Sequence, residues 1–215
     1  MIDLICIDVD GTLVGSSGTV PDDVWTTADR LRARGVRLAI CSGRPAFGIT
    51  RGYAERLDAG GWHVFQNGSS VVHLPTGRSL STALGANNVR ALVARARETG
   101  RILELYTDDG YVEETGRARA RRHAGLLGLE YRQRSLDEID PASVVRAQWL
   151  IDPAETEAIV AEAGPGLHLS PSIAPIMPDT VFLNITAAGV DKAFAVRAVA
   201  RAYGVALDRV MVVGD

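Results

Sequence analysis

The chain has 215 residues, of which 26 are acidic and 23 basic, so its formal net charge is −3. Hydrophobic residues make up 47% of the chain, which excludes a disordered polypeptide and predicts a buried core. The slight acidic excess excludes the strongly basic surface that nucleic-acid-binding proteins usually carry. Cys6 and Cys41 lie in apolar runs and are too few for a disulfide framework, which indicates free thiols in a reducing compartment.

Neither a signal peptide nor a membrane span is expected. The N-terminus lacks a basic region and carries acidic residues inside its apolar stretch. The uncharged stretch 163–178 contains four prolines, which a membrane helix would not tolerate. We therefore expect a cytoplasmic protein that binds neither nucleic acid nor a membrane.

The first 80 residues alternate between strand and helix signals. Strands are expected at residues 4–9, 36–41, 64–66 and 69–74. A helix is expected from Pro21 to Gly35, and Pro45 is expected to open a second one. Strands that are separated by helices predict right-handed crossovers and a parallel sheet.

The middle of the chain has a different order of elements. Helices are expected at 87–99, 117–127, 136–139 and 153–163. Strands are expected at 102–106, 111–113, 129–132, 145–151, 167–173 and 181–186. The first pattern then returns with a helix at 191–203 and a strand at 210–213.

This order predicts an α/β fold in which a Rossmann-like parallel-sheet core is interrupted by an inserted α+β domain. The predicted core comprises residues 1–82 and the return segment 188–215, and the insertion comprises residues 83–187.

Asp8 and Asp10 directly follow the first apolar strand. Side chains two residues apart on a strand share a face, so both carboxylates are expected at the sheet edge where α/β proteins bind ligands. Two neighbouring carboxylates repel each other, and a divalent cation relieves that repulsion. Gly11 and Thr12 could then turn backbone N–H groups toward an anion. A pair of solvated acids at a strand end is the alternative.

The second strand ends in Ser42, Gly43, Arg44 and Pro45. A hydroxyl at this position could bind a phosphate with help from a helix N-terminus. A plain Ser-Gly turn is the alternative.

Lys192 is the single lysine among the 23 basic residues. A compact ammonium approaches one phosphate oxygen as a point charge, which a guanidinium does less well. A solvated surface lysine is the alternative. The last strand delivers Asp215 to its tip, where this residue would be a third carboxylate for a Mg²⁺ site.

In this order the four segments resemble the motifs of the haloacid dehalogenase superfamily of phosphohydrolases. The matching residues are Asp8-Val9-Asp10-Gly11-Thr12 for the first motif, Ser42 for the second, Lys192 for the third and Gly214-Asp215 for the opening of the fourth. The insertion resembles the type-2 cap of the Cof-type sugar-phosphatase branch, and residues 42–45 and 66–68 are similar to segments of that branch. The resemblance covers the whole chain.

The resemblance implies a phosphomonoester hydrolase that acts on a small phosphorylated metabolite, such as a sugar phosphate or a phosphoglycolate-like acid. Asp8 would be the nucleophile that forms an aspartyl-phosphate, and Asp10 would be the general acid and then the general base. Mg²⁺ would be bound by the Asp8 carboxylate, the Asp10 backbone carbonyl and Asp215. The implied phosphate- or substrate-binding residues are Gly11, Thr12, Ser42, Gly43, Arg44, Asn67 and Lys192. For Asn67, a simple turn role is an equal alternative.

The chain departs from the family at its end. The fourth motif usually continues with a second acid four residues later and with further core elements, whereas this sequence stops at Asp215. The departure indicates a partial sequence or a product with impaired activity. The missing end therefore keeps a non-catalytic protein that binds phosphorylated ligands as an alternative. A phosphomutase of the same superfamily is a second alternative, because the sequence does not exclude it. The sequence predicts neither the particular metabolite nor the oligomeric state.

Overall fold

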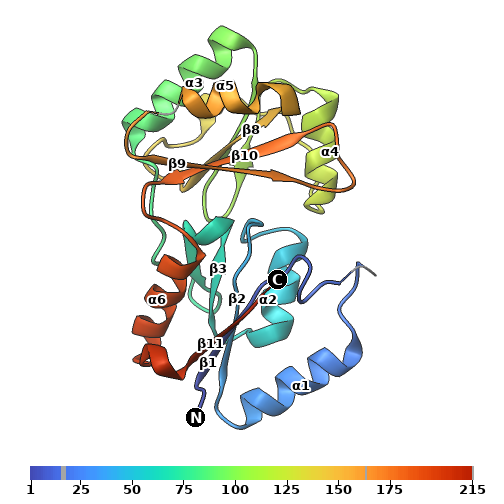
Figure 1. The fold of residues 1–215 in the computed structure, drawn as a ribbon, viewed down its shortest axis with the longest axis vertical. Helices are drawn as coiled ribbons and strands as arrows, with labels where there is room; N and C mark the ends of the chain where they lie inside the picture. The colour runs from blue at the N-terminus through green and yellow to red at the C-terminus, as the bar shows by residue number, and fades with distance from the viewer. Residues whose placement is uncertain (16–17, 163, 215) are drawn as a thin grey trace. The chain divides into compact units, whose positions relative to one another are not determined.

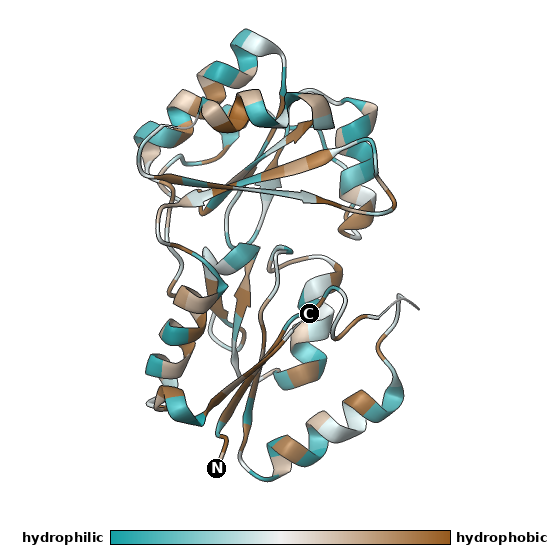
Figure 2. Cartoon of the chain, in the orientation of Figure 1, coloured by the Kyte–Doolittle hydropathy of each residue, from teal (hydrophilic) through white to brown (hydrophobic). Residues whose placement is uncertain are grey.

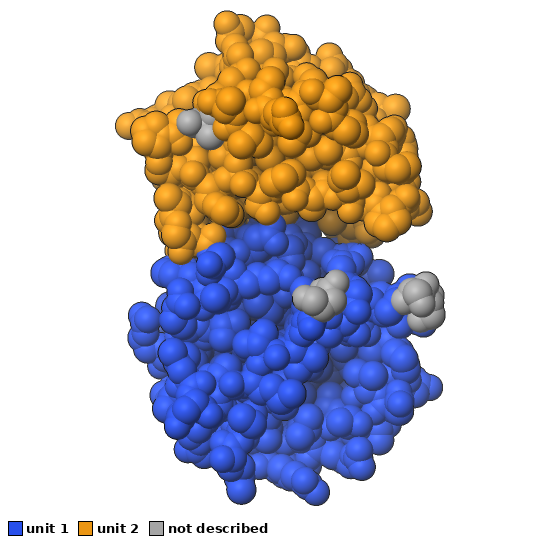
Figure 3. Space-filling view, viewed as in Figure 1, with its two compact units in different colours: residues 1–81, 191–215 blue, residues 82–190 orange. Residues whose placement is uncertain are grey.

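The computed structural model describes residues 1–15, 18–162 and 164–214, and the chain divides into two compact units. Unit 1 comprises Met1–Ser81 and Asp191–Asp215, and unit 2 comprises Thr82–Val190 (Figure 3). The sequence-based boundaries, 82/83 and 187/188, lie within a few residues of these divisions.

Unit 1 is built on a parallel sheet in the strand order β11-β1-β2. Its strands are β1 (Leu4–Ile7), β2 (Arg37–Ile40), β3 (Trp62–Phe65), β4 (Ser70–His73), β5 (Arg78–Ser79) and β11 (Val210–Val213). Cys6 of β1 lies in register between Ala39 and Val212, so the two ends of the chain meet in one sheet. A parallel bridge from Cys41 to Val64 joins β2 to the antiparallel hairpins of β3, β4 and β5.

Helices cover both faces of this sheet (Figure 1). They are α1 (Asp22–Ala33), α2 (Ile49–Asp58) and α6 (Lys192–Tyr203). Leu38 and Ile40 pack with the buried residues of α1 and α2, whereas Ala39 and Cys41 pack with those of α6. Such alternation produces two apolar faces, which is why β1, β2 and β11 are hydrophobic along most of their length (Figure 2).

Unit 2 is an antiparallel sheet in the order β7-β6-β8-β10-β9 with helices packed against it. Its elements are α3 (Ala86–Thr99), β6 (Ile102–Tyr106), β7 (Tyr111–Val112), α4 (Ala118–Leu126), β8 (Arg146–Ile151), α5 (Thr156–Ala161), β9 (Leu167–Ile173) and β10 (Val181–Ala187). Short 3₁₀ turns occur at η2 (Leu136–Glu138) and η3 (Pro153–Glu155) in this unit, and at η1 (Gln66–Gly68) and η4 (Leu207–Arg209) in unit 1.

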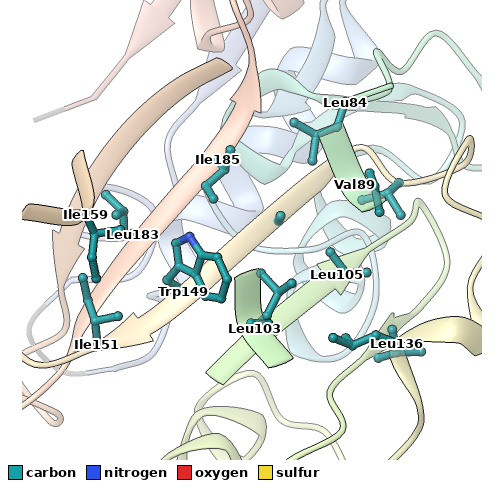
Figure 4. Close-up of a cluster of buried hydrophobic side chains, with 14 of the residues drawn as sticks. Leu84, Val89, Leu103, Leu105, Leu136, Trp149, Ile151, Ile159, Leu183 and Ile185 are labelled. Atoms are coloured by element: carbon teal, nitrogen blue, oxygen red, sulfur yellow. The ribbon is translucent and has the colours of Figure 1, made fainter. Parts of the chain in front are cut away.

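The two faces of the unit 2 sheet differ in chemistry. One face carries Leu103, Trp149 and Leu183, which pack with α3 and α5 in the largest apolar cluster of the unit (Figure 4). The other face carries a polar row in which Glu104 and Asn184 flank Gln148. These polar side chains are buried and bonded to one another and to neighbouring residues, as buried polar groups must be.

The predicted α/β class, with a parallel-sheet core and an inserted α+β unit, is confirmed. Two local predictions are wrong. Residues 129–132 form no strand, because this segment is tied instead by bonds from the Leu129 N–H to the Ala124 carbonyl and from the Tyr131 hydroxyl to Glu113. Pro45 does not open a helix: α2 begins only at Ile49, after Gly48 adopts a φ of 66° outside the helical range.

In the described ranges, no helix is both long and apolar enough to cross a membrane.

Candidate active site

Polar residues gather in unit 1 where β1, β2, β3 and β11 end. Asp8 follows β1, Ser42 lies just beyond β2, and Gly214 follows β11. The turn η1 follows β3, which is parallel to β2 at its bridge. This is the sheet edge at which α/β proteins bind ligands, because the chain leaves the strands here in loops whose polar groups point outward.

Asp8 and Lys192 form a close ion pair at this edge. Lys192 Nζ donates to Asp8 Oδ2 at 2.6 Å, and the Val9 N–H donates to Asp8 Oδ1 at 2.7 Å. The Asp8 N–H donates to the Val213 carbonyl at 2.9 Å, so backbone and side chain of Asp8 are both held. The side chain of Asp8 is 20% exposed and that of Lys192 is 39% exposed, so both remain accessible to a ligand.

Lys192 is the first residue of α6, and its position is set by the elements around it. The Asp191 side chain caps the helix by accepting the Phe194 N–H at 2.6 Å. Gly68 of η1 packs against the same turn with a φ of 96°, and a Cβ at that residue would lie 2.1 Å from the Asp191 carbonyl oxygen. Only glycine allows this approach. The loop after β3 therefore fixes the position of the first turn of α6, which carries Lys192.

Asp10 lies in the tight turn that follows Asp8. The Leu13 N–H donates to the Asp8 carbonyl at 3.1 Å and the Val14 N–H to the Val9 carbonyl at 2.8 Å, which closes the turn. The Asp10 carboxylate points to Arg44, whose Nε donates to Oδ2 at 3.0 Å and whose Nη2 donates to Oδ1 at 2.5 Å. The fold therefore brings Asp10 and Arg44 together, as the sequence predicts, but here the two side chains bond to each other.

Gly11 and Thr12 differ in what they can offer an anion. The Gly11 N–H already donates to the Val14 carbonyl at 3.0 Å, so the predicted anion contact through this N–H does not exist in the described conformation. The Thr12 N–H, by contrast, has no acceptor among the described residues. Thr12 is therefore the better of the two as an anion contact.

Ser42 and Gly43, which follow β2, lie beside Asn67 of η1. The Asn67 N–H donates to the Ser42 carbonyl at 3.1 Å, and a Cβ at Gly43 would lie 2.8 Å from Asn67 Oδ1. Ser42 has no exposed surface, and its Oγ accepts the Arg44 N–H at 3.1 Å. In this structure the serine hydroxyl therefore supports the loop that carries Arg44, and its phosphate contact stays a prediction.

Cys41 is the other nucleophilic side chain close to this edge. Burial raises the pKa of its thiol to about 12, although the neighbouring Lys192 acts in the opposite direction. Burial, with a smaller contribution from Cys41, also raises the pKa of Cys6 to about 12. Both thiols therefore stay protonated near neutral pH and are poor nucleophiles.

The oxygen atoms at this edge fit a hard divalent cation. The Asp8 carboxylate is partly exposed, and the Asp10 backbone carbonyl accepts no hydrogen bond within the described part of the chain. Carboxylate and carbonyl oxygens are the ligands that Mg²⁺ prefers. The third predicted ligand, Asp215, lies outside the described residues, and no cluster of three or more acidic, histidine or cysteine ligands occurs within them. Gly214, which precedes Asp215, packs beside Asp8.

Three residues that shape the site are absent from the sequence-based set. Asp191 could have been found as an N-cap, because an aspartate directly before a helix is a typical start signal. Gly68 is recognisable only as part of a turn, because its contact with α6 joins distant segments. Gln66 and Asn67 both adopt left-handed φ values, 53° and 57°, and no local signal marks this for glutamine.

Comparisons with known proteins show which family and which structures the chain is similar to. The sequence model of the haloacid dehalogenase-like hydrolases matches residues 5–215. A Bacillus subtilis (strain 168) protein named "Putative phosphatase YxeH" is 25% identical over 225 residues, which cover all of this chain and 81% of that protein.

Two solved structures share the fold over nearly the whole chain. A haloacid dehalogenase-like hydrolase from Bacteroides thetaiotaomicron superposes with a TM-score of 0.81 at 23% identity, covering 100% of this chain and 82% of the other. The subclass IIB sugar phosphatase BT4131 superposes with a TM-score of 0.78 at 19% identity, covering 98% of this chain and 79% of the other.

Proposed function

Because the chain belongs to the haloacid dehalogenase-like hydrolases, we propose that it is a Mg²⁺-dependent phosphatase of small phosphorylated metabolites. The observation that carries this proposal is the Asp8 carboxylate, which is partly exposed and lies 2.6 Å from the ammonium of Lys192. A phosphate dianion approaching a bare carboxylate would be repelled, and the ammonium at this position offsets that repulsion.

In the first half-reaction, Asp8 attacks the phosphorus atom and the bond from phosphorus to the ester oxygen breaks. Asp10 gives its proton to the departing oxygen, so the alcohol leaves and an aspartyl-phosphate remains on Asp8. In the second half-reaction, a water oxygen attacks the phosphorus and Asp10 takes up the water proton. The Asp8 carboxylate is then regenerated and inorganic phosphate departs.

The remaining residues bind and orient the phosphoryl group. Lys192 provides a point charge for one phosphoryl oxygen, and the Thr12 N–H provides a backbone donor. The Asp8 carboxylate, the Asp10 carbonyl and Asp215 would hold Mg²⁺. When bound, this ion adds the positive charge that lowers the barrier to attack on the phosphate.

For the substrate we propose a sugar phosphate, with unit 2 as a type-2 cap of the Cof-type branch. The proposal is supported by the matching fold of the sugar phosphatase BT4131 and by the antiparallel α+β architecture of unit 2.

Purified protein with Mg²⁺ and p-nitrophenyl phosphate tests the proposed function. We expect release of inorganic phosphate by the wild type and loss of at least about 10³-fold in kcat for Asp8→Asn, because the amide is a far weaker nucleophile. Asp3→Asn is the matched control. Asp3 lies just before the first residue of β1, at the opposite end of the strand from Asp8, and pairs with Arg209. This substitution should leave turnover unchanged. Phosphate binding without turnover by the wild type would refute the proposal, and transfer of phosphate to a second sugar would identify a mutase.

A further inference from the structure

The Asp10 carboxylate is held by the Arg44 guanidinium in a two-pronged ion pair. Nε and Nη2 of Arg44 donate to different oxygens of Asp10, at 3.0 Å and 2.5 Å, across 34 residues of sequence. A single hydrogen bond would fix only a distance. Two parallel bonds also fix the plane of the carboxylate, because the guanidinium is a rigid planar fork.

Arg44 is itself anchored at both ends of its peptide unit. Its N–H donates to Ser42 Oγ at 3.1 Å, and its carbonyl accepts the Gln66 N–H at 2.9 Å. The guanidinium therefore extends from a segment that is bonded to the end of β3 as well as to β2.

Asp10 has no comparable support of its own. Its side chain is 57% exposed, and Arg44 is the only group in the described ranges that bonds to its carboxylate. Without Arg44, the carboxylate would rotate about its side-chain bonds in water. An ion pair this exposed contributes little to folding stability, so the main consequence of its geometry is the orientation of the Asp10 carboxyl group.

We infer that Arg44 is a positioning residue that fixes the plane of the Asp10 carboxyl group and so orients it for proton transfer to the leaving group, an inference that rests on the proposed function. Arg44 occupies one lone pair of each oxygen, and the second lone pair of either oxygen can carry the proton that is transferred. The competing role is direct binding of the phosphoryl group by Arg44. The two roles differ in their dependence on the leaving group. Proton transfer matters for a basic alkoxide and hardly matters for a nitrophenolate, whereas phosphoryl binding matters equally for both.

The test measures kcat/KM of the wild type and Arg44→Lys on glucose 6-phosphate and on p-nitrophenyl phosphate. Lysine keeps the positive charge and removes the planar fork. We expect kcat/KM to fall about 10²-fold on the alkyl phosphate and less than about threefold on the aryl phosphate. The parameter kcat/KM is used because hydrolysis of the common aspartyl-phosphate affects kcat for both substrates alike.

Arg56→Lys is the matched control. Arg56 also makes a two-pronged contact, in which Nη1 and Nη2 donate to Oδ1 and Oδ2 of Asp29 at 2.9 Å and 3.0 Å, on exposed helix surfaces of unit 1. This substitution should leave both values of kcat/KM unchanged, and thermal melting should show that both variants are folded.

Equal losses on the two substrates would overturn the inference, since Arg44 would then act on the phosphoryl group itself. Unchanged activity on both substrates would overturn it as well, because Asp10 would then be oriented without Arg44. If the wild type hydrolyses neither phosphate ester, the proposed function is wrong and the inference, which depends on it, is wrong as well. This result is distinct from equal losses and from unchanged activity, because in both of those the wild type is active.

Discussion

His63 has no exposed surface and joins β2 to the end of α2. Its Nδ1 accepts the Ile40 N–H at 3.1 Å, and its Nε2 donates to the Asp58 carbonyl at 2.8 Å. This arrangement requires a neutral ring with its proton on Nε2. Burial lowers the pKa of His63 to about 4, although the bond to Asp58 offsets part of the effect.

The protein should therefore lose stability in mild acid. In the unfolded chain His63 takes up a proton near its ordinary pKa of about 6.5, whereas the folded chain excludes that proton until about pH 4. The contribution is complete above about pH 6.5 and is lost as the pH falls toward 4, by about 3 kcal/mol in total. Urea unfolding between pH 4.5 and 7.5 measures this change in the free energy of unfolding.

The control for this prediction is a histidine of unit 2, His168, which is exposed on β9. His168→Gln leaves the contacts of the His63 ring in place, so the loss of stability in mild acid should persist. His63→Gln should be less stable at neutral pH but should lose most of the slope between pH 4.5 and 6.5. An NMR resonance of the His63 ring that titrates near pH 6.5 in the folded protein would contradict the assignment.

At the scale of elements, the active site depends on how η1 meets α6. The turn follows β3 early in the chain, and α6 belongs to the segment that returns after unit 2. Gly68 allows the two backbones to touch, so the position of Lys192 relative to Asp8 is set by a contact between elements rather than by either one alone.

Gly68→Ala should displace the first turn of α6. A Cβ placed 2.1 Å from the Asp191 carbonyl oxygen forces a backbone shift of about 1 Å or more, since a normal contact is about 3.5 Å. We expect kcat/KM on p-nitrophenyl phosphate to fall about 10²-fold, because misplacement of a charged group by this amount has effects of that order.

Gly77→Ala separates misplacement from simple backbone strain. Gly77 also has a positive φ, 65°, in the turn between β4 and β5, but a Cβ there has nothing within 4 Å. In both variants the positive φ costs about 1 kcal/mol. Gly68→Ala should lose more stability because of the clash with Asp191, and only Gly68→Ala should lose activity. Equal activity in the two variants would show that the contact with α6 does not position Lys192.

At the scale of the whole molecule, each unit has an apolar core of its own. Leu38 on β2 of unit 1 and Leu183 on β10 of unit 2 are both fully buried leucines. Leu183→Ala should destabilise unit 2 by about 2–5 kcal/mol through lost apolar contacts and the cavity left behind. We expect hydrogen exchange to accelerate in β6, β8 and β10 and to stay unchanged in β1 and β2.

Leu38→Ala is the reciprocal variant. It should accelerate exchange in β1 and β2 and leave the strands of unit 2 protected, because each unit encloses its own core. If either variant accelerates exchange equally in both units, the chain unfolds as one cooperative structure and the prediction is wrong.

Much of the fold follows from periodicity in the sequence. Apolar runs such as 4–9 and 36–41 predict buried strands because a strand covered by helices on both faces has no polar side. The residue pattern at 129–132 predicts a strand, but this segment is irregular because hydrogen bonds tie it to Ala124 and Glu113. The helix start predicted at Pro45 is also wrong, because proline is compatible with the first turn of a helix but does not require one.

The chemical groups of the candidate site can be predicted from the amino-acid sequence. Asp8, Asp10, Ser42 and Lys192 are recognisable because strand ends and a helix start place their side chains at one sheet edge, whatever the details of packing. How these groups are paired depends on the folded chain: Lys192 bonds to Asp8, Arg44 bonds to Asp10, and Gly68 packs against Asp191. Such pairings join residues that are far apart in the chain, and they depend on loop paths and on close approaches between backbones. Composition and periodicity report the local preferences of a segment, and therefore carry no information about these contacts.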